Sequence, residues 1–352
     1  MAGNIYDTST LLEVSRFTRT LTPFWLSFFP RQINFETEDI FFDQVDRDYR
    51  RLAPLVAPNV QGRLGKVQGY ASLSFKPAYV KPKHAVDVGM VLERQAGEAL
   101  GTGSLSLMPR RDAVIAEILR QHDTMLTNRN EWLAARALID ASVTLTGEDY
   151  PTTTVNFQRH ASLTYTLAAG ARWSQGTATP LADILAARVN ANNRSGARVK
   201  KLVFGGTAWS YFSAHANVGL FGTGGLLDRS LGGVSADVQK IYDGYEGQEY
   251  MGRLSGSQGG GALELWVDTS KYVDDAGNEQ FFLEQKTVVG VSEVEGVRCF
   301  GAIKDLGALR AMERFPKMWV EEDPSAEYVL TQSAPLMVPK KPNASFKIIT
   351  SD

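Results

Sequence analysis

The sequence contains a single cysteine, Cys299, among its 352 residues. One thiol cannot form a disulfide within the chain, and it excludes a four-thiolate zinc site. Positive charge is not in excess either, because 37 lysines and arginines stand against 39 aspartates and glutamates, for a net charge of −2. Proteins that hold nucleic acid tightly gain affinity from phosphate contacts and carry a basic surplus. The totals therefore favour a reducing compartment and give no sign of a strongly basic nucleic-acid surface.

Long apolar runs are also missing. FWLSFF, residues 24–29, is among the longest, and it is far shorter than the roughly 20 apolar residues that cross a bilayer as a helix. Residues 1–17 lack the basic region and apolar core of a signal peptide. We expect a soluble protein that is made in the cytoplasm and has no membrane partner.

Motifs for chemistry are absent as well. The four histidines, His84, His122, His160 and His215, include no pair at the three-to-five spacing of a local metal site, and no H-E-x-x-H occurs. The glycine-rich residues 219–261 contain no phosphate-binding loop, and the chain has no G-x-S-x-G elbow. We therefore predict no catalytic residue, no cofactor and no metal, and interpret the chain as a protein that is not an enzyme.

The remaining candidates have structural interpretations. His122 falls on an apolar helical stripe, which predicts a packed histidine with a hydrogen-bond partner. Cys299 lies in the apolar run EGVRCFGAI, which predicts a small buried side chain. Carboxylates gather in runs, such as residues 36–39 and 321–323, which is typical of solvated faces or of salt-bridge partners across an interface.

Two N-terminal regions look unable to fold by themselves. Residues 1–58 place many aromatic residues between prolines and charges without a helical period, which predicts an extended arm that buries its aromatics against something else. Residues 60–108 are rich in Gly, Ser, Lys and Val and predict a long two-stranded excursion with a tip. Such a hairpin alone is marginal in water, so we expect outside support for it.

The strongest local signal is a helix over residues 110–142, a stretch without proline or glycine. Pro109 stands where a helix can begin. Apolar positions recur every three, four or seven residues along one stripe, namely Ile115, Leu119, His122, Leu126, Leu133 and Ala137. The predicted helix is about 50 Å long, at about 1.5 Å per residue, and would form the spine of a flat or elongated body.

The rest of the chain mixes strands and helices. Residues 150–174 alternate as strands do, a helix is predicted over 180–193, and a short strand followed by a helix over 198–215. Residues 219–261 are expected to be mostly loop, and residues 275–278 to turn between two strands. Residues 181–305 are thus expected to be a compact mixed α/β unit, and residues 306–352 return to a strand-like pattern. The fold class is α+β.

Several stretches resemble one known family. AYVKPKHAVD, from residue 78, is similar to the matching stretch of the lambda-type major capsid proteins of tailed phages. RFPKMWVEEDPSAEYVLTQSAPLMV, residues 314–338, resembles the C-terminal signature of that family more closely. ARWSQG at 171–176 and KLVFGGTAWSYF at 201–212 come in the expected order, whereas residues 219–261 match poorly.

The resemblance implies the Hong Kong 97-like shell fold and assigns the segments. Residues 1–58 would be the N-terminal arm, 59–108 the extended loop over a neighbouring subunit, and 109–180 the peripheral domain with its spine helix. Residues 181–305 would be the axial domain, and residues 306–352 would return to the peripheral domain. Tyr79, Lys81, Lys83 and His84 would lie near the base of the extended loop, in a contact between subunits. Acidic partners for the basic residues are expected around 36–39 or 321–323.

The function implied is that of a major capsid protein. Copies would assemble into hexamers and pentamers of an icosahedral shell, in the cytoplasm of a bacterial host, and end in the virion capsid. A scaffolding protein, a portal, a decoration protein at the threefold axes and packaged double-stranded DNA, held without sequence specificity, are the implied partners. One alternative is an encapsulin-like shell around an enzyme, which nuclease-protected DNA in purified particles would exclude. Another is a cytoplasmic α/β enzyme, which predicts small particles and a pocket with a perturbed titratable group.

Overall fold

The computed structural model describes residues 23–45, 70–93, 107–147, 150–215, 227–228, 247–254, 263–308, 311–323 and 325–351, and the single residues 55, 58 and 61. The helices are the short η1 (Trp25–Phe28), η2 (Ala161–Leu163), η3 (Ala169–Ala171) and η4 (Pro342–Ala344), and α2 (Val88–Leu92), α3 (Leu107–Ile139), α4 (Pro180–Ser195) and α5 (Gly206–Ala214). The strands are β1 (Arg31–Asn34), β2 (Ile40–Val45), β3 (Tyr70–Phe75), β4 (Lys83–Asp87), β5 (Ser142–Gly147), β6 (Tyr150–Asn156), β7 (Thr164–Thr166), β8 (Lys201–Gly205), β9 (Leu227–Asp228), β10 (Gln248–Leu254), β11 (Leu263–Asp268), β12 (Lys271–Val273), β13 (Glu279–Phe281), β14 (Thr287–Val291), β15 (Gly296–Phe300), β16 (Phe315–Glu322), β17 (Ser325–Gln332), β18 (Pro335–Pro339) and β19 (Ser345–Ile349). None of the helices in the described ranges is long and apolar enough to span a membrane.

Helix α3 is the predicted long helix and has 33 residues, or about 50 Å at about 1.5 Å per residue. The six predicted stripe residues are all buried, which confirms the period. The helix begins and ends three residues earlier than predicted. Pro109 lies in its first turn, where the missing N–H has no intrahelical acceptor to lose. Ala141, two residues after the helix, has a φ of 53°, so the chain turns away there and not after residue 142.

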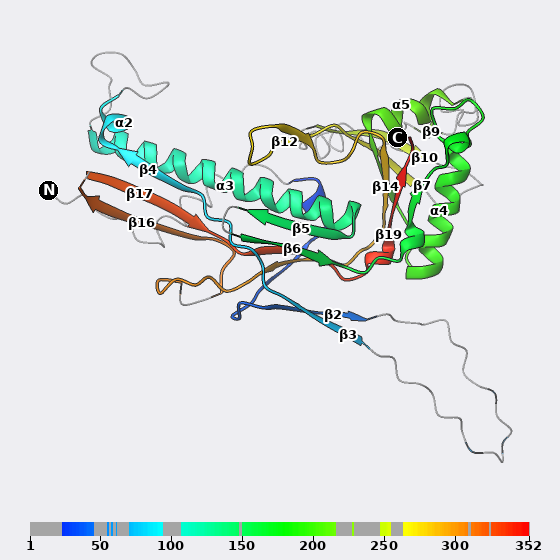
Figure 1. Ribbon diagram of the computed structural model, residues 1–352, viewed down its shortest axis with the longest axis horizontal. Coiled ribbons are helices and arrows are strands. Elements are labelled where there is room, and N and C mark those ends of the chain that lie inside the picture. The colour runs from blue at the N-terminus through cyan, green and yellow to red at the C-terminus, as the bar shows by residue number, and fades with distance from the viewer. Residues whose placement is uncertain are drawn as a thin grey trace.

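Helix α3 covers two three-stranded sheets. Its N-terminal half packs Val114 and Ile118 against Met318 and Val329 of the sheet β16-β17-β4. Its C-terminal half lies on β18 of the sheet β1-β15-β18. Figure 1 shows α3 running along the molecule above β16 and β17. The other face of β16-β17-β4 therefore points away from the helix.

A seven-stranded sheet, in the order β7-β19-β14-β8-β11-β10-β9, forms the other end of the molecule with α4 and α5 (Figure 1). Alternation along β8 explains why both faces are covered. Leu202 and Phe204 join the core beneath α4 and α5. Val203 points to the opposite face, into the core shared with α3. The predicted helix over 180–193 is confirmed as α4, which ends at Gly196 with φ +70°, a conformation that suits glycine.

The seven-stranded sheet includes two strands, β7 and β19, from outside the predicted mixed unit of residues 181–305. Strand β19 lies between β14 and β7, antiparallel to the first and parallel to the second. Residues 345–349 of the tail thus pair with strands of the seven-stranded sheet, and the assignment of residues 306–352 to the spine-helix domain stays a prediction. Only 150–156 and 164–166 of the predicted strand region 150–174 are strands. Strand β10 lies in the region predicted to be mostly loop, most of which is outside the described residues.

Among the described residues, the first aromatic ones of the predicted arm do bury against segments outside the arm, as expected, but those segments belong to the same chain. Phe24, Trp25 and Phe29 are at most 2% exposed and belong to the main core of their own chain. The ring of Phe24 lies 5.2 Å from that of Trp266. The sequence pattern gave no period because this segment is a single short helical turn between two prolines, and its burial depends on contacts distant in sequence. Residues 1–22 of the predicted arm lie outside the described residues.

A two-stranded excursion exists, but its strands differ from the prediction. Strand β2 pairs antiparallel with β3, in a register that joins Ile40 to Phe75 and Val45 to Tyr70. One strand therefore comes from the region interpreted as arm, and the predicted start near residue 60 was wrong. Figure 1 shows this pair leaving the body of the molecule. The predicted turn at 275–278 is confirmed between β12 and β13, with Gly277 at φ +85°.

Candidate functional site

Strand β4 positions two of the four predicted contact residues. It pairs antiparallel with β17, so Lys83 lies opposite Leu330 and His84 lies opposite Val329. Successive side chains on a strand point to opposite faces. Because Val86 packs beneath α3, His84 faces the helix and Lys83 faces away from it. The side chain of His84 is therefore placed for a contact inside the chain, whereas that of Lys83 is placed on the surface side of the sheet.

Lys83 lies over aromatic rings on the uncovered face of the sheet. Its Nζ is 4.0 Å from the ring centroid of Tyr328 and 5.0 Å from that of Trp319. These two rings stack with centroids 5.5 Å apart. Cation–π contacts of this kind contribute about 0.5–1 kcal/mol at exposed sites. The result is a platform of one lysine and two half-buried aromatic side chains, which we call the Lys83 platform (Lys83, Trp319 and Tyr328).

Tyr79 and Lys81 form a second, similar unit just before β4. The hydroxyl of Tyr79 donates a hydrogen bond to the carbonyl oxygen of Ala302, at 2.9 Å. The Nζ of Lys81 lies 4.8 Å from the Tyr79 ring centroid. Both Lys81 and Lys83 are exposed. The structure therefore presents two ammonium groups at the surface, each positioned by an aromatic ring.

His84 contacts a histidine that the sequence placed in the core. Its Nδ1 is 2.7 Å from Nε2 of His122, and Nδ1 of His122 is 3.0 Å from Oγ1 of Thr331. Burial, followed by the charge of His84, lowers the pKa of His122 from 6.5 to about 4. The prediction of a packed, hydrogen-bonded His122 is confirmed. Its partner was missed because the two histidines are 38 residues apart in sequence.

The acidic runs behave differently from one another. Glu38 forms ion pairs with Lys76, at 2.6 Å, and with Lys304, so it is neutralised within its own chain. Residues 321–323 are exposed at the end of the β16–β17 hairpin. Trp319 and Tyr328 were also missed as site residues. These two residues lie opposite each other in an antiparallel strand pair. The sequence alone does not show this, because it does not give the register of the two strands.

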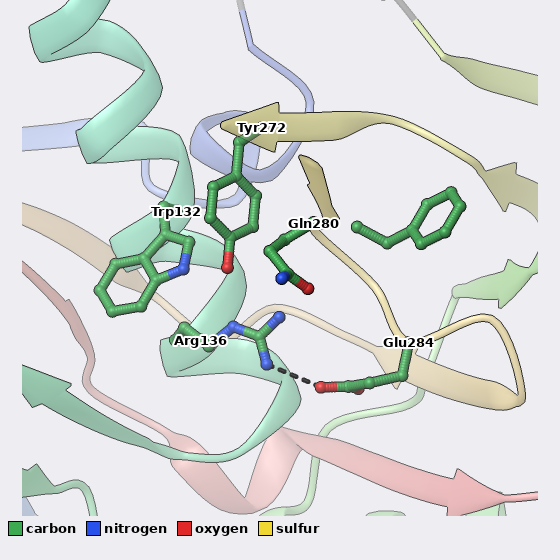
Figure 2. A pocket seen from close by; sticks show the side chains of 6 residues that line it. Trp132, Arg136, Tyr272, Gln280 and Glu284 are labelled. Carbon is green, nitrogen blue, oxygen red and sulfur yellow. Dashed lines mark hydrogen bonds and ion pairs between the residues drawn. The ribbon is translucent and has the colours of Figure 1, made fainter. Parts of the chain in front are cut away.

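A groove lies between α3 and the β12–β13 hairpin. Figure 2 shows Trp132 and Arg136 of α3 beside Tyr272, Gln280 and Glu284. The cavity that these residues line has a volume of about 370 Å³. Three of its six lining residues are aromatic, and two of the others, Arg136 and Glu284, form an ion pair with each other. This composition suits packing against a side chain more than the making or breaking of bonds.

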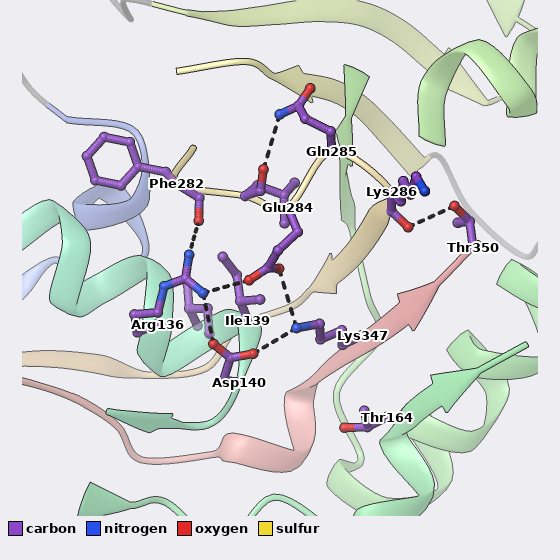
Figure 3. Close-up of polar contacts among 12 residues, drawn as sticks. Arg136, Ile139, Asp140, Thr164, Phe282, Glu284, Gln285, Lys286, Lys347 and Thr350 are labelled. Carbon is purple, nitrogen blue, oxygen red and sulfur yellow. Dashed lines mark hydrogen bonds and ion pairs between the residues drawn. The ribbon is translucent and has the colours of Figure 1, made fainter. Parts of the chain in front are cut away.

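An ion network closes the inner end of this groove. Nη1 of Arg136 donates to Oδ2 of Asp140 at 3.1 Å and to Oε1 of Glu284 at 2.7 Å, and Nη2 donates to the carbonyl of Phe282 at 2.6 Å. Nζ of Lys347 lies 2.8 Å from Oδ1 of Asp140 and 3.4 Å from Oε2 of Glu284 (Figure 3). The network joins the end of α3 to β19 and to the segment before β14. It fixes the spine helix to the seven-stranded sheet.

The described residues offer little for catalysis. They contain no group of three or more His, Cys, Asp or Glu side chains that could hold a metal ion. Cys299 is buried, as predicted, and burial raises the pKa of its thiol to about 12. A thiol in that state is a poor nucleophile near neutral pH. The surface lysines, stacked aromatics and ion networks are groups that hold protein surfaces together.

Comparison with known proteins gives one consistent result. The model of a family described as phage major capsid protein E matches residues 13–350. The major capsid protein of Escherichia phage lambda is 29% identical over 349 residues, which cover 97% of each chain. That of Escherichia phage N15 is 28% identical over the same number of residues and the same share of both chains. A crystal structure of a prophage capsid protein from Escherichia coli CFT073 superposes with a TM-score of 0.76 at 25% identity, covering 99% of this chain and all of that one.

Proposed function

Because the chain belongs to the phage major capsid protein E family, we propose that it builds the icosahedral head shell of a tailed bacteriophage around double-stranded DNA. The observation that carries this function is the similarity to phage major capsid proteins over 97% of the chain. The chain is a structural protein of the virion capsid, and it acts by binding copies of itself. An encapsulin-like compartment has less support, since the curated relatives reported above are phage proteins.

The proposed organisation follows the family's shell fold. Residues 1–58 form the arm, 59–108 the extended loop, 109–180 and 306–352 the peripheral domain, and 181–305 the axial domain. The β2–β3 pair that leaves the body supports an extended loop, although one of its strands precedes residue 59. The position of β19 in the seven-stranded sheet supports moving residues 345–349 to the axial domain.

The proposed inter-subunit contact consists of Tyr79, Lys81, Lys83 and His84. Lys81 and Lys83 are exposed, each lies over an aromatic ring, and aromatic side chains are enriched in protein interfaces, whose rims are polar. We expect them to meet carboxylates of a neighbouring copy. Residues 321–323 are the better candidates in this chain, because Glu38 already pairs with two lysines of its own subunit.

Further partners complete the proposal. The shell assembles in the host cytoplasm around a separate scaffolding protein, with a portal at one vertex. A small decoration protein binds at the threefold axes, and the lumen holds DNA without sequence specificity. The net charge of −2 is in keeping with a lumen that contains DNA without binding it tightly. Nuclease-protected DNA in purified particles would separate this function from an enzyme compartment.

The contact is tested by charge reversal at Lys81 and Lys83. The variant with Lys81→Glu and Lys83→Glu is expected to keep its circular-dichroism spectrum and to lose closed particles in sedimentation and electron microscopy. A control with Lys200→Glu and Lys271→Glu changes the net charge equally, at exposed lysines that form surface ion pairs with Glu293 and Glu279. It should assemble. Normal particles from the first variant would refute the contact.

A milder variant guards against misfolding. Lys81→Gln with Lys83→Gln removes both charges without adding repulsion in the aromatic surroundings. It should fold and form shells at a lower yield than wild type. If the glutamate variant is unfolded and the glutamine variant assembles at full yield, these lysines act within the subunit and not between subunits.

A further inference from the structure

One short segment touches three parts of the molecule that are far apart in the sequence. Residues 23–30, which we call the strap, contain the turn η1 and lie between two prolines. On one side the strap contacts α3. On another, the ring of Phe24 packs against Trp266 of β11. On a third, it lies so close to β15 that a Cβ on Gly296 would come within 3.0 Å of the Phe29 ring and the Phe28 carbonyl.

Two buried acidic side chains hold the strap, Glu131 through the backbone N–H groups of Trp25 and Leu26 and Asp268 through the side chain of Trp25. Oε1 of Glu131, on α3, accepts a hydrogen bond from the backbone N–H of Trp25 at 2.6 Å, and Oε2 accepts one from Leu26 at 2.8 Å. Oδ2 of Asp268, at the end of β11, accepts a hydrogen bond from the indole Nε1–H of Trp25 at 2.9 Å. The spine helix and the seven-stranded sheet are therefore bridged by the backbone and the side chain of one tryptophan.

Burying two acidic side chains in the core costs free energy, because both groups lose their contact with water. Glu131 is 6% exposed and Asp268 is 0% exposed. Desolvation raises the pKa of Glu131, against the effect of its backbone hydrogen bonds, and also raises the pKa of Asp268. Apolar side chains of similar size would often hold such a site at least as stably. Unlike apolar contacts, hydrogen bonds to these acidic groups fix the orientation of the strap, because each bond requires a specific N–H group to lie at the acceptor oxygen.

We propose that the strap is a conformational lock, in which Trp25 couples the seating of the N-terminal segment to the angle between α3 and the seven-stranded sheet. A small rotation of the helix against the sheet cannot keep both the Glu131 and the Asp268 hydrogen bonds to one residue. The strap therefore seats fully in one relative orientation of the two parts. When it leaves, the orientation is held by the Arg136 ion network and the remaining core alone.

The first test measures amide hydrogen exchange of the unassembled protein in the variant Glu131→Gln. A glutamine can accept from one of the two N–H groups but presents its own NH2 to the other. We expect exchange of residues 23–30 to accelerate by tenfold or more, with residues 110–126 of α3 unchanged. Glu117→Gln is the matched control, since Glu117 lies on the same helix and pairs with Arg120 at the surface. It should leave the strap unchanged.

The second test measures the angle itself. Spin labels at Gln121→Cys on α3 and Val189→Cys on α4, both exposed positions, should give a narrow distance distribution in the otherwise wild-type chain. The same labels should give a broader distribution in Glu131→Gln, and also in Trp25→Phe, which keeps an aromatic ring but deletes the indole donor. An unchanged distribution in both variants would overturn the lock, as would exchange that rises equally in all segments, which would indicate ordinary loss of stability.

Discussion

Acidification from pH 6.5 to pH 4 should destabilise the native subunit through one side chain, His122. Its ring is 1% exposed, and both of its nitrogens already have neighbours, in His84 and Thr331. In the native protein the pKa of His122 is about 4, whereas an unfolded chain has an ordinary histidine value of 6.5. Between these values the unfolded state binds a proton that the native state excludes.

The sign and size of the effect follow from this difference. The contribution of His122 to the free energy of unfolding is fully present above pH 6.5, where neither the native nor the unfolded state binds the proton. This contribution declines as the pH falls towards 4. One pKa unit corresponds to about 1.4 kcal/mol, so the full shift amounts to about 3 kcal/mol, of which most is lost by pH 4.5. That is a large share of the roughly 5–15 kcal/mol that stabilises a typical domain.

Urea unfolding of the unassembled protein between pH 7 and pH 4.5 measures this contribution. The variant His122→Gln retains hydrogen-bonding groups but does not titrate, so its stability should fall by about 2 kcal/mol less than that of wild type over this range. His160→Gln is the control, because His160 is exposed, and it should follow wild type. Parallel loss of stability in wild type and in His122→Gln would refute the reasoning, since carboxylates elsewhere titrate equally in both proteins.

Three further outcomes are expected. Gly290→Ala should lower the free energy of unfolding by about 1–3 kcal/mol in urea, because its Cβ would lie within 3.0 Å of the buried Phe346 ring, whereas Gly170→Ala has nothing within 4 Å and should be neutral. Cys299 should resist iodoacetamide at pH 8 in the native protein and react after unfolding, because burial raises the pKa of its thiol to about 12. Arg136→Met should destabilise the protein by about 1–3 kcal/mol and less so in 1 M salt, because two carboxylates lose a hydrogen-bonded cation.

Local patterns were the predictable part of the fold. The stripe from Ile115 to Ala137 predicted α3, and the turn at 275–278 was found because each depends on residues close in sequence. Strand pairing was not predictable in this way. Strand β19 enters a sheet made mostly of strands more than fifty residues earlier, and the aromatic residues of the strap are buried by β11 and α3. Single-sequence patterns do not determine such distant contacts.

The same distinction explains the candidate site. The stretch around Lys81 and Lys83 was predicted as a contact only through a family resemblance, because no local pattern indicates a contact with another chain. The Lys83 platform needed the register between β16 and β17, which brings Trp319 opposite Tyr328. His122 was placed in the core by its period, but its pairing with His84 depends on the packing of β4 beneath α3.

The central claim is that copies of this chain close into a shell. Electron microscopy of the purified protein, produced together with the other head-assembly proteins of its phage, tests that claim directly. We expect closed particles of uniform size whose surface lattice contains five- and sixfold clusters of subunits. A preparation that contains only folded particles of one to four subunits under these conditions would contradict it.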